Sequence, residues 1–207
     1  MSVIVNKLKK SRAGFTLAET LICVLILQMV SAIVGAAIPT AANVYKNTVD
    51  AANAQVLLST TMTALRDEFS TAKQVQWTSG TNTVTIYNGK GVREITAYGE
   101  EDTRPDGATA PGVWVRSDKK YDPDNPGAPV EFNEPALLIS AIAATSNMYV
   151  VFTIDSVSSH GVITLKDIQV FKSLDGKADQ ELAKQETYTI RFIGSPEVKV
   201  TAAPSTP

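Results

Sequence analysis

The chain has 207 residues, a formal net charge of −2, 44% hydrophobic residues and a single cysteine, Cys23. This length suits one membrane segment followed by one small domain with a core of its own. The single cysteine excludes an intrachain disulfide, and the acidic balance argues against a general nucleic-acid binder.

The chain opens with a short basic segment that ends at a sharp border. Residues 1–14 hold four of the 19 basic side chains and none of the 21 acidic ones, so the remainder carries 15 basic and 21 acidic residues, net −6. Residues 15–38 are apolar and, at about 1.5 Å per residue, long enough to cross a hydrocarbon core of roughly 30 Å. We expect a targeting segment over 1–14 and a transmembrane helix over 15–38, with the basic end cytoplasmic and the rest of the chain outside.

One charge interrupts the apolar segment. Glu19 is the only charged residue between Arg12 and Lys46. A carboxylate in a bilayer is costly and is rarely present without a partner, and an isolated membrane anchor has no evident use for one. Small residues in the same segment let neighbouring helices approach closely; they are Ala18, Ser31, Ala32, Gly35, Ala36 and Ala37. The pattern favours a helix that assembles with related helices.

The residues Gly14-Phe15-Thr16-Leu17-Ala18-Glu19, followed by an apolar helix, resemble the leader junction of type IV pilins and pseudopilins. In that family the prepilin peptidase cuts after the glycine and N-methylates the new terminal residue. The resemblance covers about residues 1–50. It implies cleavage after Gly14, N-methylation of Phe15 and an assembly role for Glu19, whose carboxylate would pair with the freed amine of its own chain or of a neighbour. Many pilins have a proline earlier in this helix than Pro39.

The resemblance also implies a set of partners and a location. The partners are the prepilin peptidase, other pilin or pseudopilin subunits, an inner-membrane assembly platform and membrane lipid. The chain would be a structural subunit, not an enzyme, with no cofactor. It would start as a single-pass inner-membrane protein and end in a cell-surface or periplasmic filament. Its size and long loops favour a minor pilin or minor pseudopilin. The alternative is a membrane-anchored or secreted monomeric binding domain with an ordinary signal sequence.

Residues 39–76 continue the helix in amphipathic form. Neither glycine nor proline occurs between residues 40 and 75, and apolar residues recur every three or four positions at Leu58, Met62, Leu65, Phe69 and Ala72. This spacing predicts an apolar stripe on one face of a helix, too short for a free coiled coil. We expect one helix of roughly 60 residues, continuous or interrupted near residues 35–39, whose second half packs on a globular domain.

Residues 77–200 are predicted to form an exterior β-sheet domain, because apolar residues there alternate with period two. The expected strands are 83–88, 93–98, 113–116, 148–155, 161–172, with a bulge between Leu165 and Ile168, and 186–193. Residues 134–145 favour a short helix over a buried strand, residues 174–185 a polar connection, and residues 201–207 a disordered tail. The sum is an α+β fold in which a long N-terminal helix packs on an antiparallel sheet, as in pilins.

Two features of the exterior domain bear on chemistry. His160, the only histidine, lies in a predicted turn, so no catalytic triad or histidine-rich metal site can be assembled, and a membrane-tethered hydrolase is disfavoured. Asp118, Asp122, Asp124 and Asn125 offer oxygen ligands in a turn-rich loop, which is the chemistry that calcium prefers. Lys119 and Lys120 dilute the charge of this loop and the spacing is not that of an EF-hand, so a solvated turn is favoured and calcium is the alternative.

Overall fold

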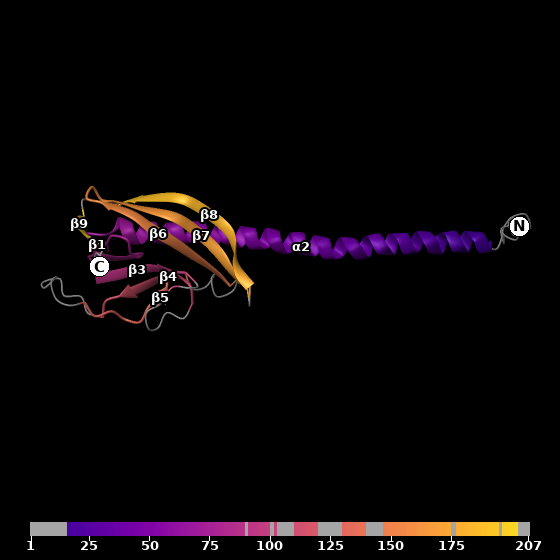
Figure 1. Cartoon of the computed structure of the whole chain (residues 1–207), viewed down its shortest axis with the longest axis horizontal. Coiled ribbons are helices and arrows are strands. Elements are labelled where there is room, and N and C mark those ends of the chain that lie inside the picture. The colour runs from indigo at the N-terminus through magenta and orange to yellow at the C-terminus, as the bar shows by residue number, and fades with distance from the viewer. Residues whose placement is uncertain are drawn as a thin grey trace, which may run out of the picture. The chain divides into compact units, whose positions relative to one another are not determined.

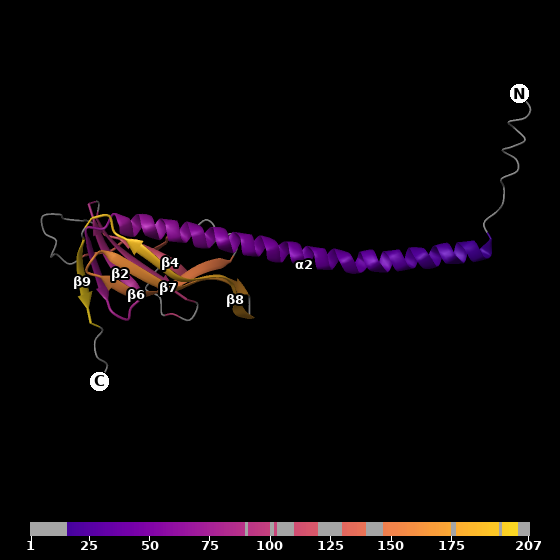
Figure 2. The same ribbon diagram turned by 90° about the horizontal axis from the view of Figure 1, so that it is seen from above.

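The computed structural model describes residues 16–89, 91–99, 102, 110–119, 130–139, 147–174, 177–194 and 196–202. The chain divides into two compact units, residues 1–49 and 50–207. The described elements are shown in Figures 1 and 2. They are α2 (Leu17–Ser70), β1 (Gln74–Thr78), β2 (Thr83–Asn88), β3 (Gly91–Tyr98), β4 (Gly112–Ser117), β5 (Ala136–Leu137), β6 (Met148–Ser158), β7 (Val162–Leu174), β8 (Lys177–Arg191) and β9 (Glu197–Thr201).

Helix α2 runs for 54 residues without a break, which is about 81 Å at 1.5 Å per residue. Pro39 lies inside it, so an interruption near residues 35–39 is not observed. Proline has no N–H to give to the preceding turn, and in that turn the Thr40 hydroxyl donates to the carbonyl oxygen of Ala36 at 3.1 Å. Of the described residues, α2 is the helix that is long and apolar enough to cross a membrane.

The helix ends at Ser70, earlier than the expected residue 76, because the following residues join a sheet. Residues 74–78 alternate between half-buried and buried positions, with Val75 and Trp77 facing the core. The Lys73 N–H donates to the carbonyl oxygen of Tyr87 at 2.7 Å, which draws the chain onto β2. Valine, tryptophan and threonine favour an extended backbone, and the sheet contact outweighs the weak helical tendency of this segment.

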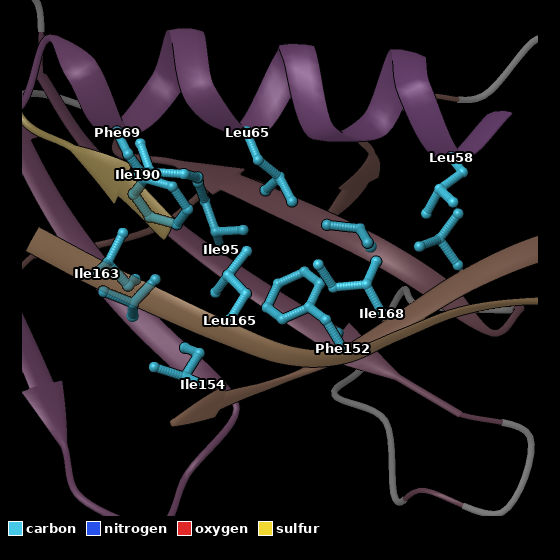
Figure 3. Close-up of a cluster of buried hydrophobic side chains, with 14 of the residues drawn as sticks. Leu58, Leu65, Phe69, Ile95, Phe152, Ile154, Ile163, Leu165, Ile168 and Ile190 are labelled. Atoms are coloured by element: carbon cyan, nitrogen blue, oxygen red, sulfur yellow. The ribbon is translucent and has the colours of Figure 1, made fainter. Parts of the chain in front are cut away.

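The apolar stripe of α2 is confirmed as the face that packs on the sheets. Leu58, Leu65, Phe69 and the nearby Ala72 are buried and Met62 is partly buried. Figure 3 shows Leu58, Leu65 and Phe69 pointing from the helix toward apolar side chains of the strands. Burying each large apolar side chain contributes roughly 1.5–3 kcal/mol. The second half of the helix therefore belongs to the core of the exterior domain, in an α+β arrangement.

Two sheets share this core. The larger has the strand order β5-β4-β3-β2-β1-β9, and the smaller has the order β6-β7-β8. All pairings are antiparallel except that of β1 with β9, which is parallel. The larger sheet is therefore mixed, where the sequence predicted an antiparallel one. Strand β9 was not expected, since a five-residue strand carries little local signal.

Most of the predicted strands are confirmed, and two connecting segments are corrected. Residues 136–137 form β5 and a turn follows, so the helix expected over residues 134–145 is wrong for the described residues 134–139; residues 140–146 lie outside the described part. The polar connection expected over residues 174–185 is wrong because β8 begins at Lys177. β8 lies at the edge of its sheet and is exposed at most positions, so its polar composition fits a strand. Of the expected tail, Thr201 belongs to β9, and residues 203–207 lie outside the described part.

The irregularity expected between Leu165 and Ile168 is present in β7. The register with β6 shifts opposite this point, and Asp167 has a φ of 49°, a left-handed conformation that aspartate tolerates better than most residues. The Asp167 carboxylate accepts a hydrogen bond from Lys184 Nζ at 3.2 Å. This bond, together with the negative charge of Asp167, raises the pKa of Lys184 above its ordinary value.

Substituting the buried stripe should cost stability that substituting the exposed half of the helix does not. Leu65 is fully buried, whereas Leu25 is 52% exposed. Leu65→Ala should destabilise the domain by about 2–5 kcal/mol, because it removes apolar contacts and leaves a cavity. Leu25→Ala should leave the unfolding free energy of the domain unchanged. Urea unfolding of the full chain in detergent micelles, followed by the fluorescence of the buried Trp77 and Trp114, measures both. Equal midpoints for the two variants would contradict this packing.

An ion pair links α2 to the smaller sheet, one helical turn before Ala54, the first buried residue of the helix. Asp50 and Lys172 of β7 form this pair, with side chains only 19% and 17% exposed. Asp50→Ala should lower the unfolding free energy by about 1–3 kcal/mol, because it leaves a largely buried ammonium without its partner. The exposed pair Lys199–Glu197 is the control: Lys199→Met should change the same free energy by less than about 1 kcal/mol.

Candidate functional site

The candidate site lies at the start of helix α2. Gly14 and Phe15, the predicted cleavage and methylation residues, lie outside the described residues. Thr16 is the first residue that the structure describes, and α2 begins at Leu17. Glu19 stands in the first turn of the helix, so the predicted assembly residue is placed at the end of α2 where the orphan backbone N–H groups are.

Thr16 and Glu19 are joined by three hydrogen bonds. The Thr16 N–H and the Thr16 hydroxyl both donate to Glu19 Oε2 at 2.9 Å. In return the Glu19 N–H donates to Thr16 Oγ1 at 3.2 Å. This reciprocal arrangement is a capping box, in which an N-cap threonine and a glutamate three residues later satisfy each other's backbone N–H groups. The carboxylate therefore has a use within its own chain.

That use was not among the expectations above, although its signal is visible in the sequence. Thr16-Leu17-Ala18-Glu19 has the Thr-x-x-Glu spacing of a capping box directly before an apolar run. An ordinary anchor helix can thus employ the same glutamate to begin its first turn. The presence of Glu19 alone therefore does not distinguish a helix that assembles with other helices from an isolated membrane anchor. Other features of the chain are needed for that distinction.

The carboxylate is satisfied on one oxygen only. Both hydrogen bonds from Thr16 end at Oε2. Within the described residues, Oε1 accepts no hydrogen bond and Glu19 forms no ion pair. Glu19 is exposed. One lone-pair-bearing oxygen therefore remains open to a donor from outside the described part of the chain.

The surface around Glu19 is apolar. Every described residue from 16 to 49 is exposed, and a shallow groove along α2 is lined by Leu17, Thr20, Leu21, Val24, Leu25 and Gln28. Cys23 is exposed on the same stretch. A helix that is apolar on all sides is stable only in lipid or against other apolar surfaces. Within the described part of the chain, no other apolar surface covers the first half of α2.

Exposed apolar side chains continue beyond the length that a bilayer covers. Residues 17–38 already span about 33 Å of helix, against a hydrocarbon core of about 30 Å. Tyr45, Val49 and Val56 lie further along and remain exposed by 73%, 37% and 54%. Their spacings of four and seven residues place them on one face of the helix. This face points away from the buried stripe and has no cover in the described part of the chain.

Of the four calcium candidates, Asp118 alone lies among the described residues. Asp118 Oδ1 accepts the N–H of Val92 at 3.0 Å, and the Asp118 N–H donates to the carbonyl oxygen of Val92 at 3.0 Å. A Cβ at Gly91 would lie 2.5 Å from Oδ1, so the glycine makes room for this carboxylate. Asp122, Asp124 and Asn125 lie outside the described residues. Where side chains are described, three or more His, Cys, Asp or Glu residues nowhere gather as metal ligands.

The other sites considered from the sequence lack reactive surroundings. His160 is exposed in the turn between β6 and β7, where its N–H donates to Ser158 Oγ at 3.2 Å. A small crevice of about 20 Å³ lies between α2 and strands β4, β5 and β6, and its described walls carry no charged side chain. Two lining residues carry hydroxyls: that of Thr61 donates to the carbonyl oxygen of Leu57 at 2.8 Å, and that of Tyr149 donates to Asp179 Oδ2. These are the contacts of a solvated turn and of a packed interior.

The Asp118 carboxylate should act in packing rather than in metal binding. Asp118→Ala removes the acceptor of the Val92 N–H and should lower the unfolding free energy by about 1–2 kcal/mol. The loss should be the same with millimolar calcium as with a chelator, measured by thermal unfolding of the full chain in detergent micelles. A melting temperature of the unsubstituted chain that rises with calcium, and does not rise for Asp118→Ala, would instead assign Asp118 to a calcium site.

The start of α2 is therefore a helix cap with one carboxylate oxygen to spare, set on an apolar surface. Its described contacts are hydrogen bonds between Thr16 and Glu19. Comparisons of this chain with family models, with curated proteins and with solved structures found no match in any of the three.

Proposed function

We propose that this chain is a structural subunit, of the minor type, of a type IV pilus-like or type II secretion-like filament. In this proposal the prepilin peptidase removes residues 1–14 and methylates Phe15. An assembly platform in the inner membrane then adds the chain to other pilin or pseudopilin subunits through α2. The resemblance of residues 14–19 to the pilin leader junction supports the proposal. The length of α2 and the exposed apolar side chains along it also support the proposal.

The observation that carries the proposal is the uncovered apolar face of α2. Lipid covers an anchor over about 30 Å, yet exposed apolar side chains reach Val56. A monomeric anchored domain gains nothing from an apolar stripe in water. Other copies of the same kind of helix cover both the lipid-length part and its continuation, and the small side chains of residues 31–37 allow close approach.

Glu19 contributes a charge that lipid does not tolerate alone. Removal of the leader creates an amine on Phe15, with a pKa near 8 in model peptides and thus mostly cationic at neutral pH. Methylation keeps that charge. The open Oε1 of Glu19 can accept a hydrogen bond from the amine of a neighbouring subunit. Opposite charges attract more strongly in lipid than in water because the dielectric constant is low, and such a pair sets the register between subunits.

A second function is favoured by the capping box. If Glu19 serves only to cap its own helix, the chain is a membrane-anchored or secreted monomeric binding domain. The two functions differ in what they require of residue 19. A cap requires a side-chain acceptor, which glutamine also supplies, whereas pairing with an amine requires the negative charge.

The substitution Glu19→Gln therefore separates the two functions. It should leave leader removal unchanged and lower incorporation into filaments at least about tenfold, the effect of losing roughly one charge-assisted contact. Gln28→Leu, at a second polar position in the same helix, is the control and should incorporate normally. Cells expressing the full chain are sheared, and the filament fraction is compared with the membrane fraction by immunoblot. Incorporation of Glu19→Gln equal to the unsubstituted chain would reject the charge pair.

Mass spectrometry of the N-terminus tests the processing step independently. The mature chain should begin with N-methyl-Phe15, and Gly14→Val should retain the leader and stay in the membrane, because in the family that the leader junction resembles the cut falls after this glycine. A chain that begins near Ile38 would have been cut by an ordinary signal peptidase, and the monomeric binding domain would then replace the filament subunit.

A further inference from the structure

We infer that Tyr45 and Lys46 form an anchor for phospholipid headgroups at the end of the membrane span that is nearer the exterior domain. The Lys46 ammonium binds lipid phosphate, and the Tyr45 ring lies at the level of the headgroups. This inference rests on the proposed function, because the anchor needs a precursor in which a bilayer surrounds α2. It adds a lipid contact that selects which part of the long apolar helix the bilayer covers.

The position of the two residues along α2 matches the far surface of a bilayer. Helix α2 is continuous from Leu17 to Ser70. Leu17 and Tyr45 are 28 positions apart, which is about 42 Å at 1.5 Å per residue. A bilayer with its headgroups is roughly 40–45 Å thick, of which the hydrocarbon core is about 30 Å. When Leu17 lies at one surface of the membrane, Tyr45 and Lys46 therefore reach the headgroups of the other.

The polar ends of both side chains have no partner among the described residues. Tyr45 is 73% exposed and Lys46 is exposed, and neither side chain forms an ion pair or a hydrogen bond in that part of the chain. Asp50 stands one helical turn after Lys46, but its carboxylate pairs with Lys172. The charge of Lys46 is therefore open to an anion from outside the described residues.

Lipid phosphate is the anion that fits this position. Lys46 is the first basic residue after Arg12, so the apolar span separates two positively charged ends. The lysine stem can lie along the acyl chains while its ammonium reaches the phosphates. Tyrosine is enriched at the same level of membrane proteins, because its ring is apolar and its hydroxyl is polar. Lys46 supplies the charge complementary to the headgroups, and Tyr45 supplies the amphipathic ring.

The anchor determines how deep the helix lies. Exposed apolar side chains extend from Leu17 to Val56, which is longer than the hydrocarbon core, so burial of apolar surface alone does not select one depth. A charge held at the headgroups does select it. Val56 then lies about 15 Å beyond Lys46 along the helix, where lipid does not reach it and the other subunits of the proposed filament can cover it.

Acylation of individual lysines in the full chain tests the contact. The chain is placed in nanodiscs of phosphatidylcholine and phosphatidylglycerol, or in micelles of an uncharged maltoside detergent, and a water-soluble acylating reagent is followed by peptide mass spectrometry. Lys46 should react at least about fivefold more slowly in the nanodiscs, the effect of one lysine held at an anionic surface. Lys73, which is exposed beyond the end of α2, is the internal control and should change by less than about twofold.

Two results of this experiment would overturn the anchor. One is an equal rate of acylation of Lys46 in nanodiscs and in micelles. The other is protection of Lys46 by inorganic phosphate added to the micelles, because the residue would then bind free phosphate without a membrane.

The native Cys23 supplies a probe of depth without an added cysteine. It is exposed on α2, about 9 Å along the helix from Leu17. A nitroxide on its thiol reports depth in the nanodisc through its accessibility to oxygen and to a water-soluble nickel complex. The double substitution Tyr45→Ala/Lys46→Gln should move the nitroxide by about 3 Å or more, the rise of two residues, because the helix can then slide. Arg66→Gln removes the same charge from an exposed position about 30 Å farther along α2 and should leave the depth unchanged.

The outcomes distinguish this inference from the proposed function. If the nickel complex reaches the Cys23 nitroxide of the unsubstituted chain as readily as oxygen does, α2 does not span the membrane, and the proposed precursor fails together with the anchor. If that nitroxide lies in the hydrocarbon core and the double substitution leaves its depth unchanged, the anchor is overturned while the filament subunit stands. The same holds if Arg66→Gln moves the nitroxide as far as the double substitution does.

Discussion

A carboxylate on an apolar helix has to be satisfied wherever that helix goes, and this requirement organises the N-terminal part of the chain. In water Glu19 would need no partner, but α2 is long and apolar enough to cross a membrane, where a lone carboxylate is costly. Thr16 meets half of the requirement with a peptide N–H and a hydroxyl directed at one oxygen. In the proposed filament, the other half would come from the amine of a neighbouring subunit. A group that is half satisfied in the monomer favours a state in which it is fully satisfied.

The second half of α2 packs on the two sheets instead of remaining exposed. Its buried stripe packs against the two sheets. Together with large apolar side chains from the strands it forms one core (Figure 3). Charged contacts tie the rim of this packing: Asp50 with Lys172, and Glu68 with Arg93 of β3. Burial of the stripe contributes most of the free energy that holds α2 on the sheets. The ion pairs fix the position of the helix along the strands. In the described part of the chain, Tyr45, Val49 and Val56 remain exposed.

The parts of the fold that follow local rules could be predicted from the sequence. The stripe from Leu58 to Phe69, the strand over residues 83–88 and the irregularity near Asp167 depend on spacing within a few residues. The end of α2, strand β8 and strand β9 could not, because each is decided by a partner far along the chain. β8 is polar since it lies at a sheet edge, and polarity alone favours a loop. At the site, Glu19 stands out by its charge. The capping box of Thr16 and Glu19 is equally local. The same residues also belong to the leader-junction pattern, which accounts for them without a cap, so the cap was not predicted.

The parallel pairing of β9 with β1 has a consequence for how the domain matures. Gln74 lies opposite Glu197, and the N–H of Glu197 donates to the carbonyl oxygen of Lys73, just behind the end of α2. Closing so long a loop is slow, and no local contact compensates for it until the strand arrives. During folding, the β1 edge of the larger sheet thus stays unpaired until β9 arrives. A chain whose β9 has not yet paired would offer the free N–H and C=O groups of β1 to strands of other molecules, so it would be prone to aggregate.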